Sequence, residues 1–407
     1  MPHITPEVET FARIKVLGVG GSGKNAINHM INSKVKGVDF IAVNTDAQDL
    51  HNTLAKKKIH IGKNLTKGLG TGMNADLGRR AVEETKEELQ EALKGADMVF
   101  VAGGMGGGTG SGASPIVAKT AKELGALTVA VVTKPFFFEG MQRSKVADQA
   151  LENLRKEVDA IIVIPNDRLL SNIDRNTTAK AAFAMCDEVL KQAVEGISDL
   201  ITTPGIINID FADVRSVMEN TGAALMGIGQ ASGEKRAEDA AKMAISSPLL
   251  DISIAGAKGV LFAVAGGDDL TMFEIQDAAK VITESIDPNA KVIFGTVRDE
   301  KLKKGEVKVT VIATGFGDGH APMPSVKSKS LFSSPLEGKN DKADKDAKDK
   351  EESKGKIHNS IMSPAPKEDK HDKVSEKVIE DKKPSIPTID SDDDDWGAVP
   401  AFLRRKK

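Results

Sequence analysis

The hydrophobic pattern of residues 13–164 is a series of short apolar runs, each followed by a polar or glycine-rich turn and usually by a segment of helical periodicity. Short apolar runs predict buried strands, and strands that alternate with helices predict a parallel, doubly wound sheet of the α/β class. The predicted strands are residues 13–17, 40–43, 98–102, 128–132 and 160–164. Ligands bind at the carboxyl ends of such strands, and the unusual loops of this region all follow a strand.

The pattern changes in the second half of the chain. Helical periodicity from about residue 177 to residue 200 predicts a long, largely buried helix. Beyond residue 218 strands and helices mix, which predicts a second, α+β domain with a mixed four-stranded sheet. Its predicted strands are residues 223–228, 259–265, 291–297 and 306–316, and its predicted helices are residues 236–245 and 272–285.

Beyond residue 317 the apolar pattern stops, and residues 338–394 are rich in lysine and acidic residues without a single aromatic one. Such a composition cannot build a core, so a disordered charged linker is expected. Apolar residues return in the last dozen positions. The predicted organisation is a flexible N-terminus (1–10), an α/β domain (11–176), a core helix (177–202), an α+β domain (203–317), a linker (318–391) and a C-terminal peptide (392–407).

The most informative motif is Gly103–Gly112, which reads GGMGGGTGSG. It follows the predicted strand 98–102 and precedes a predicted helix over residues 113–119, with Pro115 near its first turn. Glycines let the backbone approach a ligand, and N–H groups at a helix N-terminus bind anions. The motif therefore predicts a phosphate-binding loop.

A second glycine motif, Gly18–Lys24, fits both G-x-G-x-x-G and G-x-x-x-x-G-K. The first pattern is typical of dinucleotide binding, with Asp46 as the acid for a ribose. The second begins a P-loop, but Asn25 stands where that loop needs Ser or Thr for magnesium. These residues alone leave both alternatives open. Each places phosphates on a helix that begins near Gly21.

The order GGGTGSG resembles the signature of the tubulin superfamily, in particular the FtsZ family of bacterial cell-division GTPases. The resemblance extends over residues 11–316 and returns in the last dozen residues. It implies a tubulin/FtsZ GTPase domain that binds GTP and GDP, with Mg²⁺ held mainly by the nucleotide phosphates. It implies that phosphates and neighbouring groups are held by Gly20, Gly21, Ser22, Gly23, Lys24, Asn25, Asn44, Gly70, Thr71, Gly72, Gly104, Met105, Gly106, Gly107, Gly108, Thr109 and Gly110.

The same resemblance assigns Glu139 and Arg143 to ribose and phosphate, and Asn166, Phe183 and Asp187 to the base. A carboxylate at position 187 accepts from both guanine N1 and N2, which favours guanine over adenine. Ser22 and Lys24 depart from many relatives. Because lysines are mostly exposed, Lys24 is expected to project into solvent.

The stretch Asn208–Val214 resembles the synergy loop of FtsZ, which implies catalytic roles for Asn208, Asp210 and Asp213. As a purely structural alternative, Asp213 would cap a helix starting at Val214, and Asp210 is not needed for that cap. The long helix separates this loop from the nucleotide loops by about 35 Å. The acids are therefore expected to act on the nucleotide of the next subunit in a head-to-tail filament. A self-contained, non-polymerising nucleotide enzyme is the alternative.

Composition bears on the cellular compartment, on nucleic-acid binding and on metal sites. A single cysteine with no signal peptide or long apolar run predicts a cytoplasmic protein, and Cys186 is expected to be a buried thiol. A net charge of −3 gives no electrostatic case for nucleic-acid binding. No His/Cys cluster indicates a metal site built from protein side chains.

The tail carries the only tryptophan, Trp396, after an aspartate run. An apolar segment that follows a soluble tether predicts a peptide ligand for grooves on other proteins. It resembles the FtsZ tail that binds membrane anchors and regulators at the mid-cell ring, so membrane association would be indirect. The expected partner-binding residues are Trp396, Val399, Pro400, Phe402, Leu403 and Arg404.

Overall fold

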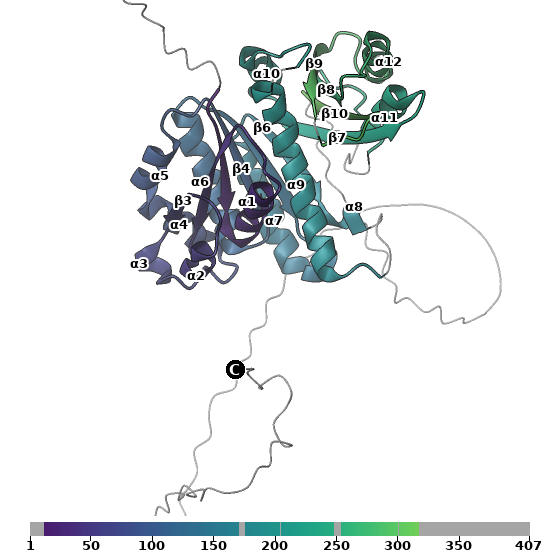
Figure 1. The fold of residues 1–407 in the computed structure, drawn as a ribbon. Coiled ribbons are helices and arrows are strands. Elements are labelled where there is room, and N and C mark those ends of the chain that lie inside the picture. Colours follow the sequence, from purple (N-terminus) through teal and green to yellow (C-terminus); the bar gives the residue numbers. More distant parts are fainter. Residues whose placement is uncertain (1–11, 171–175, 204, 248–253, 300, 317–407) are drawn as a thin grey trace, which may run out of the picture. The chain divides into compact units, whose positions relative to one another are not determined.

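The computed structural model describes residues 12–316, except 171–175, 204, 248–253 and 300 (Figure 1). The expected N-terminal segment, linker and partner-binding peptide, including Trp396 to Arg404, therefore lie outside the described residues. No described helix is both long enough and apolar enough to cross a membrane.

The strands form one ten-stranded sheet in the order β3-β2-β1-β4-β5-β6-β7-β10-β8-β9. The first six strands along the chain are parallel, as the apolar runs predict. The β4–β5–β6 side carries almost unbroken apolar sequence because helices cover both faces. These strands are Ile14–Val19 (β1), Val38–Asn44 (β2), Lys57–His60 (β3), Met98–Gly104 (β4), Leu127–Lys134 (β5) and Ala160–Pro165 (β6).

The order 3-2-1-4-5-6 is that of a doubly wound dinucleotide-type sheet, and it reverses between β1 and β4. A crevice opens at such a reversal because the helices that follow the two strands pack on opposite faces. The helices of this half are Gly20–Asn32 (α1), Ala47–His51 (α2), Lys63–Thr66 (α3), Ala75–Glu84 (α4), Lys86–Leu93 (α5), Gly108–Glu123 (α6), Phe137–Glu139 (η1), Met141–Arg155 (α7), Asn166–Leu170 (α8) and Ala179–Thr202 (α9).

The second half contributes a mixed sheet, as expected, but β7 also pairs in parallel with β6 through residues 160–162 and 222–224. β10 runs antiparallel to β7 and β8, and β9 is parallel to β8. The elements here are Phe211–Met218 (α10), Gly222–Ser232 (β7), Arg236–Ile245 (α11), Gly259–Gly266 (β8), Met272–Thr283 (α12), Lys291–Arg298 (β9) and Glu306–Thr314 (β10).

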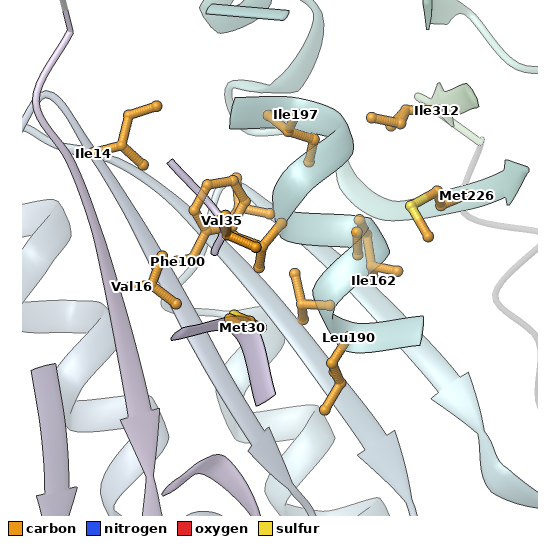
Figure 2. Packing of buried hydrophobic residues seen from close by; sticks show 14 of the residues in the cluster. Ile14, Val16, Met30, Val35, Phe100, Ile162, Leu190, Ile197, Met226 and Ile312 are labelled. Carbon is orange, nitrogen blue, oxygen red and sulfur yellow. The ribbon is translucent and has the colours of Figure 1, made fainter. Parts of the chain in front are cut away.

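One apolar cluster lies between α1, α9 and the sheet (Figure 2). Leu190 and Ile197 of α9 face Phe100 and Ile162 of the parallel strands. Met226 of the second half belongs to the same cluster, so both halves pack on α9. A second cluster fills the opposite face, under α4 to α7.

One predicted helix has different bounds, and a second helical stretch is interrupted. The glycine-rich loop is shorter than expected, because α6 begins at Gly108 and Pro115 lies inside it rather than in its first turn. The helical stretch of residues 75–93 is divided into α4 and α5 at Thr85, whose hydroxyl donates to the Ala81 carbonyl and accepts from the Gly62 N–H. A hydroxyl that bonds nearby backbone groups competes with the helical ladder, which explains the break.

Candidate functional site

A cavity of about 390 Å³ opens at the reversal of strand order. Its walls come from the ends of β1, β4 and β5, the first turns of α1 and α6, the segment around η1 and α7, and the beginning of α9. The lining residues that the sequence singled out are Gly20, Gly21, Ser22, Asn25, Thr71, Gly104, Met105, Gly107, Gly108, Thr109, Gly110, Glu139, Arg143, Asn166, Phe183 and Asp187.

The N-termini of α1 and α6 meet in this cavity. A Cβ on Gly20 would lie 3.0 Å from the amide nitrogen of Gly110, so the two backbones approach each other closely. Neither helix has a side-chain cap or an acidic residue in its first turn. Their first N–H groups and their positive dipole ends therefore favour an anion, and a phosphate chain fits this arrangement.

Hydroxyl groups hold the glycine-rich backbone in place. Ser22 Oγ accepts from the Gly104 N–H at 2.6 Å, which ties α1 to the end of β4. Thr109 Oγ1 lies 2.7 Å from Thr45 Oγ1 and 3.2 Å from Thr71 Oγ1. These bonds join four separate loops into a preformed cradle, which lowers the entropy lost when a ligand binds.

The other end of the cavity has polar groups without partners. Asn166 Oδ1 is buried and accepts no hydrogen bond from a described residue. Burial raises the pKa of the Asp187 carboxyl to about 6, against the opposing charges of His29 and Lys24. No donor among the described residues bonds this carboxylate. Because buried polar groups are normally satisfied, the unpartnered Asn166 oxygen and the half-buried Asp187 carboxylate in the same cavity point to a ligand that donates hydrogen bonds.

A half-exposed aromatic ring and an ion pair complete the wall. The Phe183 ring contacts Phe136 edge to face, with centroids 5.3 Å apart. Arg143 pairs with Glu139, which also accepts from the Phe136 N–H at 3.0 Å. A flat apolar surface beside polar acceptors suits a nucleobase, and the Arg143 guanidinium suits a phosphate or ribose.

Known proteins have the same architecture. Residues 13–174 match the model of the tubulin/FtsZ family GTPase domain, and residues 222–317 match that of the FtsZ family C-terminal domain. A solved structure of an FtsZ dimer from M. jannaschii is 47% identical; the match covers 76% of this chain and 89% of that one, with a TM-score of 0.72. The chain belongs to the FtsZ family. It is therefore a GTPase of the tubulin/FtsZ type that binds GTP and GDP.

Two more distant structures share the fold of this FtsZ-family chain. CetZ2 from Haloferax volcanii is 22% identical with a TM-score of 0.63, and the match covers 74% of this chain and 92% of that one. CetZ1 from the same organism is 21% identical with a TM-score of 0.66, and the match covers 75% of this chain and 95% of that one. At this identity the comparison concerns the fold alone.

Some residues that the FtsZ resemblance assigned to the nucleotide do not line the cavity: Gly23, Lys24, Asn44, Gly70, Gly72 and Gly106. Gly23 packs α1 against the sheet, since a Cβ there would lie 2.6 Å from the Ala102 carbonyl oxygen. The prediction that Lys24 projects into solvent is wrong. Its side chain is 13% exposed, and its Nζ pairs with Asp49 at 2.7 Å.

This pairing also bears on the two other nucleotide motifs. A P-loop lysine would extend toward phosphates, but Lys24 binds Asp49, which also accepts from Asn44 Nδ2 at 2.8 Å. The acid of a dinucleotide site would face the cavity, but Asp46 caps α2 by accepting from the Asp49 N–H. In this structure Lys24 and Asp46 therefore take neither the P-loop role nor the dinucleotide role.

Sequence reasoning missed five lining residues: Val19, Thr133, Pro135, Cys186 and Leu190. Val19 is a variable position of the Gly18–Lys24 motif at the end of β1, and the other four carry no motif. Thr133 and Pro135 lie at the end of β5, and Cys186 and Leu190 lie on α9. Cys186 is buried, as predicted, and burial raises the pKa of its thiol to about 12. It is therefore a wall residue and not a nucleophile.

The synergy-loop residues Asn208, Asp210 and Asp213 lie outside this cavity and are exposed. Asp210, not Asp213, is the N-cap of α10, because α10 begins at Phe211 and the Asp210 carboxylate accepts from the Ala212 N–H at 3.2 Å. The prediction that Asp213 caps this helix is wrong. The Asp213 carboxylate is in the first turn of α10 and binds no described residue.

The lengths of two helices, α9 and α6, give the separation between these acids and the cavity. α9 leaves the cavity at Leu190 and ends at Thr202, about 18 Å further along its axis. α6 begins in the cavity and ends at Glu123, a similar length away. Arg215 of α10 donates to the carbonyl of Gly125, just beyond that far end of α6. The acids thus lie at the end of the parallel strands opposite the cavity.

No group of three or more His, Cys, Asp or Glu side chains within the described ranges could hold a metal ion.

Proposed function

We propose that this FtsZ-family GTPase assembles head to tail into filaments and hydrolyses GTP at each contact between subunits. In this proposal Asn208, Asp210 and Asp213 of one subunit act on the γ-phosphate bound in the cavity of the next. A contact of one end with the other end of the next copy does not close, and so makes a filament.

The observation that carries this proposal is the state of the carboxylates in the cavity. Among the described residues that line it, two are acidic, Glu139 and Asp187. Glu139 is paired with Arg143, and Asp187 lies among the unpartnered acceptors at the base end. A side chain that orients the attacking water, such as a free carboxylate, must lie within hydrogen-bond reach of the γ-phosphate. The exposed Asp210 and Asp213 can supply one only from another subunit.

The exposed apolar residues support a contact between the two ends. Near the cavity, Phe137 and Met141 are 73% and 78% exposed. At the synergy-loop end, Ile206 is 73% exposed, next to Ile207, whose N–H binds Thr296 of β9. Apolar surface at both ends favours burial in a subunit contact. The M. jannaschii FtsZ of 47% identity was solved as a dimer.

The cellular role that follows is a cytoplasmic filament at the mid-cell division ring. Mg²⁺ would be held mainly by the β- and γ-phosphates, which it bridges in phosphoryl transfer. Membrane anchors and regulators would bind the C-terminal peptide, so contact with the membrane would be indirect. These parts of the proposal rest on the family and on the sequence of the tail.

Mixing two inactive variants tests the shared active site. Asp213→Asn keeps the cavity intact, and Asp187→Ala keeps the acids but weakens nucleotide binding. Each alone is expected to turn over little GTP. An equal mixture is expected to regain turnover, because the acids of one variant then meet the nucleotide of the other. A mixture no more active than the sum of its parts would contradict the proposal.

Nucleotide binding should depend on pH through Asp187. Guanine donors require an ionised carboxylate, whereas burial raises the pKa of free Asp187 to about 6, above its ordinary value. Binding below pH 6 is therefore expected to release a proton, and affinity should fall by up to tenfold per pH unit. Calorimetry in buffers of different ionisation enthalpy measures both the number of protons released and the affinity.

Asp187→Asn is the matched control for this titration. Its affinity for GTP at pH 7 should be about 10- to 100-fold lower, because charge-assisted hydrogen bonds are lost. Between pH 5 and 7 its affinity should vary less than that of the native chain, because only the nucleotide phosphate then titrates. The free variant should also be more stable than the native chain above pH 6, since the raised pKa means that the folded state disfavours the charged form. A variant that releases as many protons on binding as the native chain would contradict the role of Asp187.

A further inference from the structure

A second cavity, of about 490 Å³, lies at the beginning of β1, β2 and β3, away from the nucleotide site. We call it the β1–β3 cavity. Its floor is apolar and includes Ile31, Val38 and Phe40, and at its rim Leu54 is 51% exposed. Ligand cavities of this size are usually apolar with a few charged groups at the edge.

The charged residues that line the β1–β3 cavity are mostly basic. Lys15, Lys56 and Lys57 line it, with Asp39 as the one acid among the lining residues. Two donors of Lys15 bind the carbonyls of Ala92 and Lys94 at 2.9 Å, and burial together with Lys57 lowers the pKa of its amine. Lys56 and Lys57 are exposed and form no ion pair with a described residue. The rim therefore favours an anionic ligand attached to an apolar group.

The chain itself contains a segment of that chemistry. Residues 392–395 are four consecutive aspartates, and Trp396 follows them directly. The aspartates complement the lysine rim, and an indole is the largest apolar group that a protein offers to such a cavity. The segment thus offers acidic residues for the lysine rim and, next to them, an aromatic residue for the apolar floor.

The length of the chain allows this contact. Phe316 is the last residue described, and 79 residues lie between it and Trp396. A chain of that length without secondary structure has a root-mean-square span of about 50 Å. That span is comparable with the diameter of a globular unit of 300 residues. Tethering also keeps the effective concentration of the segment high, so even a weak contact is populated.

We propose that the β1–β3 cavity binds the chain's own C-terminal segment, with Trp396 against the apolar floor and Asp392–Asp395 against Lys56 and Lys57. A docked tail has its tryptophan covered, so a partner of the tail must compete with the cavity. The tail would then be released for partners only where they are concentrated. This contact is independent of the role proposed for the acids of the synergy loop.

The composition of the chain provides a direct probe. Trp396 is the only tryptophan and the chain has no tyrosine, so its indole fluorescence reports on the tail alone. In the full-length chain with GDP, the native protein is expected to emit at shorter wavelength and to be quenched less by acrylamide than Lys56→Glu/Lys57→Glu. The double variant Lys303→Glu/Lys304→Glu, which reverses an adjacent pair of exposed lysines elsewhere, should behave as the native chain.

Disulfide trapping gives a second measurement. Leu54→Cys combined with Ala398→Cys is expected to form an intramolecular bond in several-fold higher yield than Lys303→Cys with Ala398→Cys, and the yield should not change on dilution. Cys186 is buried and its thiol stays protonated. Equal fluorescence in both charge-reversed variants, equal trapping at positions 54 and 303, or trapping that disappears on dilution would each overturn the proposal.

Discussion

Asp213→Asn is expected to lower GTP turnover at least 100-fold while GTP binding stays unchanged. The carboxylate at position 213 is exposed and binds no described residue, so its loss should not affect folding. A general base or water-orienting group contributes typically 10²- to 10⁴-fold to a rate. Turnover is measured as phosphate release at saturating GTP, and binding by calorimetry.

Asp210→Asn is the matched control for stability, because Asp210 caps α10. Asparagine caps a helix about as well as aspartate, so the fold should persist while turnover falls. Asp210→Ala should lose both turnover and about 1 kcal/mol of stability. Full turnover in either asparagine variant would contradict the assignment of the acids.

Gly112→Ala is expected to lower the free energy of unfolding by about 3 kcal/mol or more. A Cβ at this position would lie 1.9 Å from the Ala75 carbonyl oxygen, because α4 crosses α6 there. Alanine is favoured over glycine in a helix by about 1 kcal/mol. The clash outweighs this gain, because the atom that the new Cβ meets belongs to the backbone of α4 and cannot move aside as a side chain can. Urea unfolding followed by circular dichroism measures the difference.

Gly107→Ala is the control five residues earlier. No atom lies within 4 Å of a Cβ at this position, and the backbone φ of −85° suits any residue. Its stability should be unchanged or slightly higher, since alanine restricts the unfolded chain. If Gly112→Ala were as stable as Gly107→Ala, Gly112 would not be required by the packing of α4 against α6.

This contrast shows what the sequence could and could not predict. Glycine content predicted a place of close backbone approach, because loss of Cβ is needed wherever backbone approaches backbone or ligand. It could not tell the two uses apart. Gly107 lines the cavity, whereas Gly112 is required by the crossing of α4 and α6, which depends on tertiary structure.

The parallel strands were predictable because continuous apolar runs leave few alternatives. The contacts of individual polar side chains were harder to predict. Thr85 interrupts a helix and Asp210 rather than Asp213 caps one, and each outcome depends on one or two hydrogen bonds between a side chain and the backbone. Lys24 was wrongly expected in solvent, because its partner Asp49 lies on another helix, α2. Charge partners that are distant in sequence leave no periodic pattern.

The central claim is that catalysis needs two subunits. Phosphate release from GTP, with Mg²⁺ present and light scattering recorded in parallel, should be measured over a range of protein concentrations. We expect a threshold concentration below which turnover per chain collapses and scattering disappears. Turnover per chain that stays constant down to nanomolar protein would mean a self-contained active site, and would contradict the role proposed for Asp210 and Asp213.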